Sequence, residues 1–265
     1  MRVRCFNGMT PRALYIPHGG GPLPIMGEPG HADMVDYLSN IEAEIGRPSA
    51  IVLVSAHWER PQPTILANPS PELYFDYYGF PDETYQYSYP APGSPELADK
   101  LFAALKSAGL SPQLDHERGF DHGMFIPLML MYSDASIPVV QISLVDGLDA
   151  KGHIELGRAL APAIADDVLV LGSGMSFHNM NAFGDTPESK QFDQWLESVC
   201  VADTDERDRE AQLVDWESAP AARFSHPREE HLVPLHVCYG IAGTAATRSF
   251  TGQVINTTVA AYSWA

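Results

Sequence analysis

Residues 51–58 read Ile-Val-Leu-Val-Ser-Ala-His-Trp, and this stretch decides the fold. Its four branched aliphatic residues in succession predict a strand that is buried on both faces, which is typical of parallel sheets covered by helices. The run ends in a Ser-Ala step, and His57 follows it. Ligands of open α/β sheets bind just beyond the carboxyl ends of the strands. We therefore expect His57 at a functional edge of the sheet.

The same pattern occurs twice more in the chain. The apolar run 13–16 leads into Pro-His-Gly-Gly-Gly-Pro, which carries His18, and the run 168–171 leads into Gly-Ser-Gly-Met-Ser-Phe-His, which ends at His178. Three predicted strands thus each deliver a histidine to one edge of a sheet.

The remaining segments alternate between apolar strands and helical patterns. Such alternation predicts a mainly parallel sheet. We expect helices over 31–46, 94–108, 125–132, 149–164, 187–215 and from 226 to about 239, and strands over 138–144 and within 252–264. No linker or repeat divides the chain. The expected fold is therefore one α/β domain over residues 1–265, with a mainly parallel, mixed sheet flanked by helices and a metal site at the strand carboxyl ends.

Residues 61–95 interrupt this alternation. They combine many prolines with eight aromatic residues, which predicts a long loop with one short strand near 84–88. Long ordered loops tend to be functional. Two interpretations stay open: an aromatic flap packed over the sheet edge, or a wall of the substrate site.

Charge and cysteine content exclude several classes of protein. The chain has 265 residues with 34 acidic and 16 basic side chains, a formal net charge of −18, which argues against nucleic acid or an anionic membrane surface as a partner. Cys5, Cys200 and Cys238 form no C-x-x-C pair, so neither a zinc ribbon nor a disulfide framework is expected. The N-terminus lacks a signal-peptide pattern, and no apolar run has membrane-spanning length. A reducing, cytoplasmic location is the expectation.

The strand-end histidines favour a metal site. A single histidine beside apolar sequence is more often a packing or surface residue, but imidazoles gathered from separate strand ends suit zinc, iron or copper. In the helix predicted from His226, neighbours such as Glu230 and His231 would point about 100° apart and would not bind one ion together. His231 is the best candidate in that segment to complete the set.

Several motifs together resemble the DOPA-dioxygenase branch of the class III extradiol ring-cleaving dioxygenases, the LigB-like superfamily. They occur in order from residue 13 to about 243: Pro-His-Gly-Gly-Gly-Pro, Ser-Ala-His-Trp-Glu, Tyr-Tyr-Gly-Phe-Pro, Tyr-Pro-Ala-Pro-Gly, Asp-His-Gly, Gly-Ser-Gly-Met-Ser-Phe-His-Asn and His-Pro-Arg-Glu-Glu-His. The resemblance is specific to the family and much less so to a substrate.

The resemblance implies one metal ion held by His18, His57 and His231, a three-histidine variant of the two-histidine, one-carboxylate site of the protocatechuate branch. It implies Fe(II) for activity, and such a set also suits Zn(II). His178 then serves in proton transfer and His122 steers substrate or the oxygen adduct; His178 as a fourth ligand stays open. Asp121 either orients His122 or caps a helix.

The implied reaction is extradiol opening of a catechol ring, DOPA-like or otherwise substituted, with O₂. Composition suggests Tyr74, Tyr77 and Tyr85 as pocket walls, and Arg228 or Arg60 as an anchor for a substrate carboxylate. Two alternatives are a zinc-dependent hydrolase and a non-catalytic metal-binding or interaction protein on the same fold. The sequence indicates neither the particular catechol nor the oligomeric state.

Overall fold

The aliphatic run forms the centre of the sheet. In the computed structural model, which describes residues 12–265, β2 spans Ala50–Arg60 and is buried over most of its length. Ile51 and Leu53 pack into one apolar cluster, and Val52 and Val54 pack into another. This alternation is the period-2 pattern of a strand between two covering layers, as the run of aliphatic residues predicted.

Eight strands form one mixed sheet in the order β4-β3-β5-β2-β6-β1-β8-β7. Its middle is parallel: β2 pairs with β5 and β6, and β6 pairs with β1. The bounds of the other strands are β1 Ala13–Pro17, β3 Thr64–Leu66, β4 Gln113–Asp115, β5 Val139–Val145, β6 Val168–Gly174, β7 Thr247–Val254 and β8 Thr257–Trp264. Antiparallel pairs β3–β5, β1–β8 and β7–β8 flank the parallel core. The prediction of a mainly parallel, mixed sheet is confirmed.

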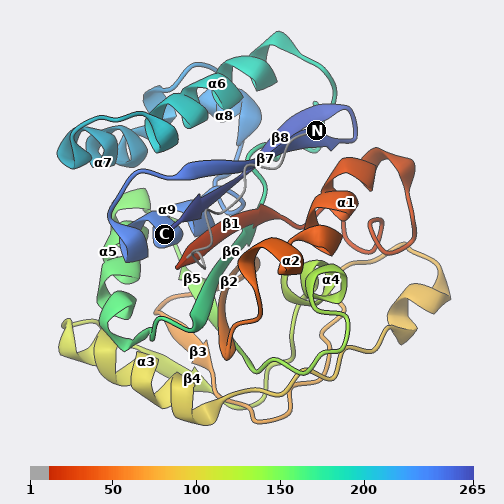
Figure 1. The fold of residues 1–265 in the computed structure, drawn as a ribbon, viewed down its shortest axis with the longest axis vertical. Helices are drawn as coiled ribbons and strands as arrows, with labels where there is room; N and C mark the ends of the chain where they lie inside the picture. The colour runs from red at the N-terminus through yellow and green to blue at the C-terminus, as the bar shows by residue number, and fades with distance from the viewer. Residues whose placement is uncertain (1–11) are drawn as a thin grey trace.

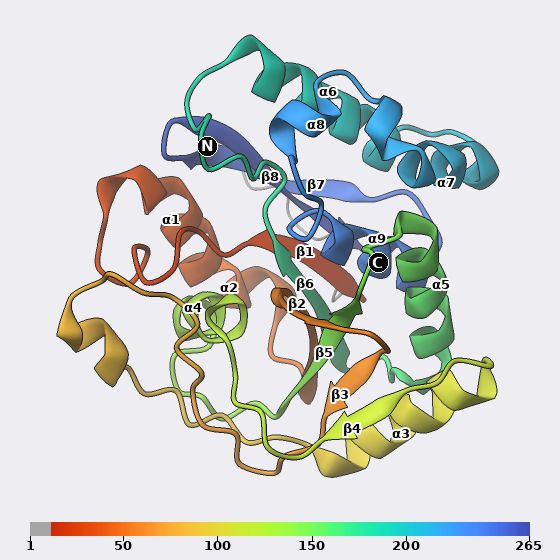
Figure 2. The ribbon, with the colours of Figure 1, turned by 180° about the vertical axis from the view of Figure 1, so that it is seen from behind.

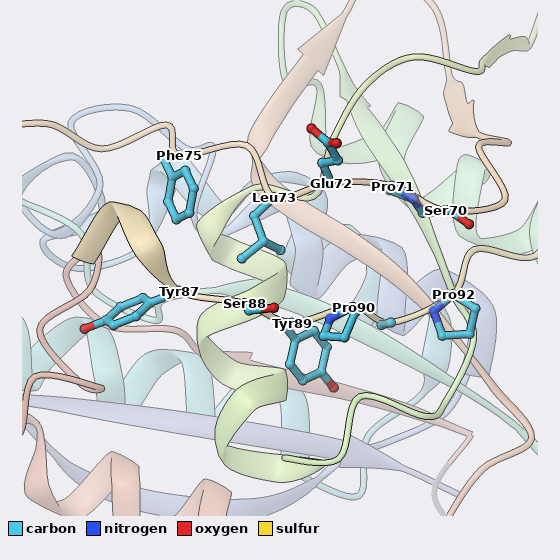
Figure 3. A pocket seen from close by; sticks show the side chains of 11 residues that line it. Ser70, Pro71, Glu72, Leu73, Phe75, Tyr87, Ser88, Tyr89, Pro90 and Pro92 are labelled. Atoms are coloured by element: carbon cyan, nitrogen blue, oxygen red, sulfur yellow. The ribbon is translucent and has the colours of Figure 1, made fainter. Parts of the chain in front are cut away.

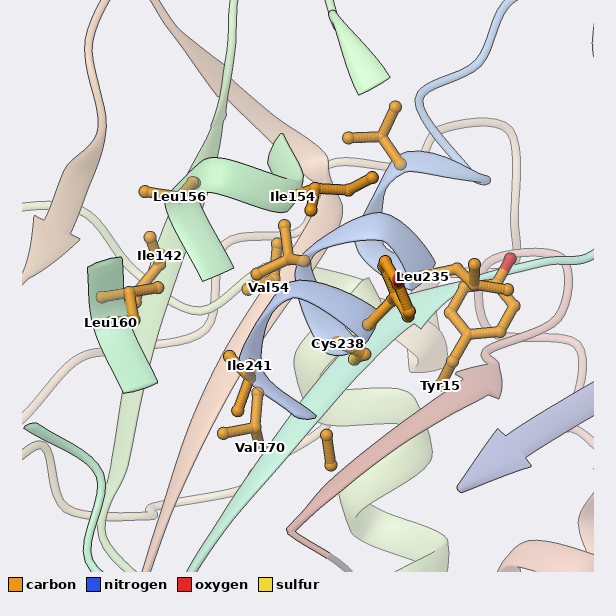
Figure 4. Packing of buried hydrophobic residues seen from close by; sticks show 14 of the residues in the cluster. Tyr15, Val54, Ile142, Ile154, Leu156, Leu160, Val170, Leu235, Cys238 and Ile241 are labelled. Atoms are coloured by element: carbon orange, nitrogen blue, oxygen red, sulfur yellow. The ribbon is translucent and has the colours of Figure 1, made fainter. Parts of the chain in front are cut away.

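Helices cover both faces of this sheet (Figures 1 and 2). One layer contains α3 (Pro95–Ser107), α5 (Ala150–Leu160) and α9 (Val233–Ala242), and the other contains α1 (Ala32–Asn40), α2 (Glu42–Ile45) and α4 (His122–Met131). Figure 4 shows α5 and α9 packing Ile154, Leu235 and Ile241 against Val54 and Val170. The helices α6 (Pro187–Val201), α7 (Glu206–Val214) and α8 (Ala222–Ser225) lie at the end of the sheet formed by β7 and β8.

The helix predicted over 187–215 is divided into α6 and α7 by residues 202–205, and two other predicted elements are wrong. The helix expected from His226 begins only at Val233, where Pro234 occupies the first turn, a position at which proline is well tolerated. Residues 226–232 are turns instead. The strand expected over 84–88 is a 3₁₀ turn, Asp82–Gln86, because the Thr84 amide and hydroxyl both donate to the carbonyl of Pro81.

Cys200 and Cys238 are buried free thiols, and Cys5 lies outside the described residues. Within residues 12–265, no helix has both the length and the apolar character that a membrane crossing requires.

Candidate metal centre

Five histidine rings meet at the carboxyl edge of the parallel strands. His18 follows β1 directly, His57 lies near the end of β2, and His178 comes four residues after β6. His122 is the first residue of α4, and His231 lies two residues before α9. Each ring centroid lies within 5.4 Å of at least one other in the set. The structure thus brings together all five histidines that the sequence analysis selected.

Close backbone packing brings the His231 segment onto the strand ends. The amide of Met175 donates to the His231 carbonyl over 3.1 Å, and the Tyr15 hydroxyl donates to the same oxygen over 2.7 Å. A Cβ on Gly174 would stand 2.1 Å from that carbonyl oxygen, so this position requires glycine. The loop before α9 is therefore held against β1 and β6.

His57 lies at an irregularity in its strand. The pairing of β2 with β5 shifts register between Val54 and Glu59, and such bulges re-aim side chains near functional sites. The first turn of α4 packs directly against this bulge, since a Cβ on Gly123 would stand 2.5 Å from the Ser55 hydroxyl and 3.1 Å from the His57 ring. The Asp-His-Gly motif is thus explained by close packing as well as by its histidine.

The rings of His18, His57 and His231 form a nearly equilateral triangle. Their centroids are 4.8, 5.1 and 5.0 Å apart for the pairs 18–57, 18–231 and 57–231. Rings bound to one ion at about 2.1 Å through a nitrogen would have centroids about 3.2 Å from it, so these separations correspond to angles of about 100°. The centroid spacing of these three imidazoles is therefore compatible with one shared metal ion.

The nitrogen atoms themselves group differently. Ligand atoms of His18, His57 and His122 lie within 4.8 Å of one another, and those of His178, Glu230 and His231 form a second such group. The His57 and His122 centroids are only 3.9 Å apart, which corresponds to an angle of about 75° at a shared ion. The centroid spacing thus favours His231 as the third ligand, and the nitrogen spacing favours His122. His122 is the competing third ligand.

Each of the five rings has a polar partner at its Nδ1 atom. The partners are Ser173 Oγ for His18 (2.9 Å), Asp76 Oδ2 for His57 (3.7 Å), Asp76 Oδ1 for His122 (2.8 Å), and Glu230 Oε1 for both His178 (3.1 Å) and His231 (2.9 Å). A carboxylate only accepts hydrogen bonds, so it favours a proton on Nδ1 of His122, His178 and His231; the 3.7 Å separation of Asp76 from His57 exceeds hydrogen-bond length. That tautomer leaves Nε2 unprotonated and able to bind a metal.

The tautomer of His18 follows from its hydrogen bonds. The Ser173 hydroxyl donates to the carbonyl of Gly123, so its oxygen accepts from His18 Nδ1. The free Nε2 of His18 lies 3.0 Å from Nε2 of His57. Two lone pairs this close repel unless a proton or a cation lies between them, and a metal ion would satisfy both.

The three proposed ligands are held in the form that metals bind. Burial lowers the pKa of His18, His57 and His231 well below the ordinary value, and the neighbouring histidines lower it further. Neutral imidazole is the ligand form. The residues present therefore fit a divalent metal in their arrangement, hydrogen bonding and charge.

Two carboxylates beside these histidines, Asp76 and Glu230, were not predicted from the sequence as site residues. Burial raises the pKa of Asp76, but the hydrogen bond from His122 and the proximity of His57 outweigh it, so the pKa falls below its ordinary value. For Glu230 the hydrogen bond from His178 likewise outweighs burial. Asp76 lies among tyrosines in the long loop and carried no periodic signal. The predicted helix directs Glu230 about 100° away from His231 and so gives it no place in the site, whereas the structure has a turn at this position.

Asp121 has neither role expected for it. Its carboxylate accepts hydrogen bonds from the Ser55 hydroxyl (2.7 Å), Arg118 (3.1 Å) and Gln141, and its side chain does not cap α4. Asp76 is the residue that contacts both the backbone amide and the ring of His122. Asp121 instead joins β2, β5 and the loop before α4 through these three hydrogen bonds.

A cavity of about 740 Å³ opens beside His57. Its lining includes Trp58, Glu59, Arg60, Tyr74, Asp76, Asp115, Glu117, Arg118 and Gly119. The Arg118 guanidinium lies over the rings of Trp58 and Tyr74 at 4.9 and 5.0 Å. Both signs of charge therefore face this cavity, next to one of the proposed ligands.

The other predicted substrate contacts lie elsewhere. Tyr77 is buried among Phe75, Phe80 and Tyr85, with its ring 5.9 Å from that of His122. The loop therefore packs as an aromatic flap, and Tyr74 alone of the three predicted tyrosines lines the cavity beside His57. Arg228 is paired with Glu59 through both guanidinium Nη atoms, so it bridges the His231 loop to β2.

Comparison with known proteins gives a consistent family match. Residues 12–263 match the model described as "Catalytic LigB subunit of aromatic ring-opening dioxygenase". The chain is 36% identical to the dioxygenase tasH of Hapsidospora irregularis, over 97% of this chain and 86% of that protein. It is 41% identical to the 4,5-DOPA dioxygenase extradiol of Beta vulgaris, over 74% of each chain.

A bacterial relative and a solved structure extend the match. The chain is 33% identical to the 4,5-DOPA dioxygenase extradiol of Escherichia coli K12, over 84% of this chain and 82% of that one. The crystal structure of the uncharacterized protein JW3007 from the same organism superposes with a TM-score of 0.77 at 28% identity, covering 96% of this chain and 99% of the other.

Proposed function

The chain belongs to the family of the catalytic LigB subunit of aromatic ring-opening dioxygenases, and from that premise we propose that it opens the ring of a catechol with dioxygen at one metal ion held by His18, His57 and His231. Membership makes the protein an oxidoreductase of the extradiol ring-opening type with a non-haem metal. The observation that carries the proposed ligand set is the even triangle of the three rings.

We propose Fe(II) as the active metal. When bound, it would supply the redox step between catechol and dioxygen, which zinc, lacking redox chemistry, does not provide. Zn(II) remains a competent occupant of the same histidines, and the three neutral ligands keep a zinc-dependent hydrolase as the alternative.

His178 is the proposed acid and base. Its ring stacks on His231 with centroids 3.3 Å apart and planes 18° apart. Because both Nδ1 atoms face Glu230, the Nε2 lone pairs run nearly parallel and do not converge on one ion. This geometry supports the proposal that His231 binds the metal and that His178 does not. The free ring is available to take a catechol proton and to return it on ring opening.

His122 is proposed to orient the substrate. Its ring lies 3.9 Å from the His57 ring, between the metal ligands and Tyr77 of the aromatic flap. A catechol beside the metal would thus contact an imidazole whose Nδ1 is already bound to Asp76. The remaining nitrogen is free for a substrate or oxygen atom.

The substrate class that we propose is a substituted catechol, as the names of three plant relatives and one bacterial relative suggest. The cavity beside His57 is the proposed place for the ring substituent, and Arg60 and Arg118 with the facing carboxylates would contact a polar one. Arg228 is engaged by Glu59 and is not proposed as an anchor.

Oxygen consumption tests the function. The protein, loaded anaerobically with Fe(II), should take up oxygen with at least one member of a catechol panel and form a yellow ring-opened product. The Zn(II)-loaded protein should not, and a variant of the exposed His116, His116→Ala, should behave as wild type. Turnover with zinc in the absence of oxygen would instead establish hydrolysis.

A further inference from the structure

Two partly buried carboxylates each lie beside one proposed ligand and one proposed proton-transferring or steering histidine. Asp76 lies 2.8 Å from His122 Nδ1 and 3.7 Å from His57 Nδ1. Glu230 Oε1 lies 2.9 Å from His231 Nδ1 and 3.1 Å from His178 Nδ1. The five-ring cluster therefore divides into two carboxylate-centred pairs and His18.

The position of Asp76 is set by an extended segment, residues 72–76. The Tyr74 amide donates to the Phe120 carbonyl over 2.7 Å, and the Phe120 amide donates to the Glu72 carbonyl over 2.8 Å. Side chains along the segment alternate: Leu73 and Phe75 point into a second cavity of about 520 Å³ (Figure 3), and Tyr74 and Asp76 line the cavity beside His57. Backbone pairing thus anchors the chain two residues before Asp76.

Asp76 also meets the start of a helix. Its Oδ1 accepts from the backbone amide of His122, the first residue of α4, over 3.0 Å. One carboxylate oxygen therefore satisfies an unpaired amide of the helix and holds the ring of the same residue. This fixes both the backbone and the side chain of His122.

Glu230 is aligned from the opposite side of the site. Arg228 pairs with Glu59 on β2 and lies 3.5 Å from Glu230 Oε2. The Glu230 side chain is only 13% exposed, so its contacts with the rings are shielded from water. Because Glu230 Oε1 faces the Nδ1 atoms of both His178 and His231 and is shielded from water, it sets the direction of both rings.

We infer that Asp76 and Glu230 are positioning residues: Glu230 sets the orientation and the Nδ1–H tautomer of the proposed ligand His231 and of His178, and Asp76 sets those of His122. The inference rests on the proposed ligand set. Partners of this kind orient a ligand imidazole and raise its basicity, and their loss typically costs about 10- to 100-fold in metal affinity. The distances assign that loss chiefly to Glu230, because Asp76 is close to His122 and farther from His57.

The test measures the metal and the tautomer rather than turnover. Zn(II) affinity is determined by chelator competition for wild type, Glu230→Gln and the matched control Glu229→Gln. Glu229 is adjacent in sequence but pairs with Arg223 at 2.6 Å, away from the rings. We expect Glu230→Gln to bind Zn(II) about 10- to 100-fold more weakly and Glu229→Gln to bind as wild type.

Imidazole ¹⁵N shifts of the metal-free protein give a second readout. The Nδ1–H pattern expected for His178 and His231 should be lost or mixed in Glu230→Gln and kept in Glu229→Gln. Should Glu230→Gln fail to fold, Asp76→Asn carries the same test on His122, with Glu117→Gln, from the same cavity, as its control. Unchanged Zn(II) affinity and unchanged tautomers in a folded Glu230→Gln protein would overturn the inference.

Failure of the proposed function is a separate outcome. These measurements use zinc and no catechol, so they stand whether or not the iron-loaded protein consumes oxygen.

Discussion

The His57–Asp76–His122 half of the centre and the His178–Glu230–His231 half each combine two histidines with one carboxylate, but their geometry differs. In the first, the carboxylate uses separate oxygens and the rings are 3.9 Å apart with planes at 44°. In the second, one oxygen contacts both rings, which stack at 3.3 Å and 18°. The first half is built on a strand and a helix terminus, and the second on two loops.

The difference shows how a carboxylate between two histidines can either position mainly one ring or hold both rings. Where the carboxylate favours the non-ligand ring, as Asp76 favours His122, it mainly sets the group that meets substrate. Where it holds both rings equally, as Glu230 does, it couples a metal ligand to the proton-transferring ring.

The largest effect should come from removing a ligand. His231→Ala should lose Zn(II) affinity by far more than the roughly 10- to 100-fold cost of an outer contact, and His122→Ala should keep most of it. Chelator competition and metal content after dialysis measure both. The reverse result would make His18, His57 and His122 the ligand set, as the spacing of their nitrogen atoms permits.

The next largest effect should distinguish the roles of His178 and His122, the two histidines that are not proposed as ligands. His178→Ala should retain metal and lower kcat about 10²- to 10⁴-fold, the usual contribution of a positioned acid or base. His122→Ala should act more on KM, because the proposed role of His122 is orientation. Steady-state oxygen uptake with one catechol checks both variants. Unchanged kcat in His178→Ala on every catechol would remove the acid–base assignment, and loss of metal would make His178 a ligand.

The smallest effect concerns acid stability of the loop half. Burial lowers the pKa of His226, at the start of this loop, to about 3, while its Nε2–H donates to the carbonyl of Ser176. The unfolded chain takes up this proton below about pH 6.5 and the folded protein does not, so stability falls as pH drops from about 6.5 towards 3. One such group contributes a slope of about 1.4 kcal/mol per pH unit.

Urea unfolding between pH 7 and 4.5 measures this slope. His226→Gln, which keeps a donor for Ser176, should unfold with a shallower pH dependence than wild type by about that amount. Equal slopes for the two proteins would show that His226 does not contribute.

Much of the fold was predictable because its signals are local. The side chains of residues 51–54 alternate between two apolar clusters. Ser94, which precedes Pro95, caps the start of α3 because its hydroxyl accepts a hydrogen bond from the amide of Leu97. Period and capping depend on neighbours in sequence, so they survive without knowledge of the fold. The helix predicted from His226 is wrong because contacts distant in sequence determine the conformation of this segment. Tertiary contacts of the His231 carbonyl with Met175 and Tyr15 hold that segment in turns.

Periodicity and motifs alone indicate that β2 is buried on both faces, that three strands carry histidines to one edge, and which family the chain resembles. That Asp76 and Glu230, 154 positions apart in the numbering, each lie beside a pair of histidine rings is visible only in the folded chain. The folded chain also directs the Asp121 carboxylate to Ser55, Arg118 and Gln141, and it pairs Arg228 with Glu59. The physical reason is range: a strand or a cap depends on residues a few positions away, whereas a hydrogen-bond partner is chosen by whatever the folded chain brings within about 3 Å.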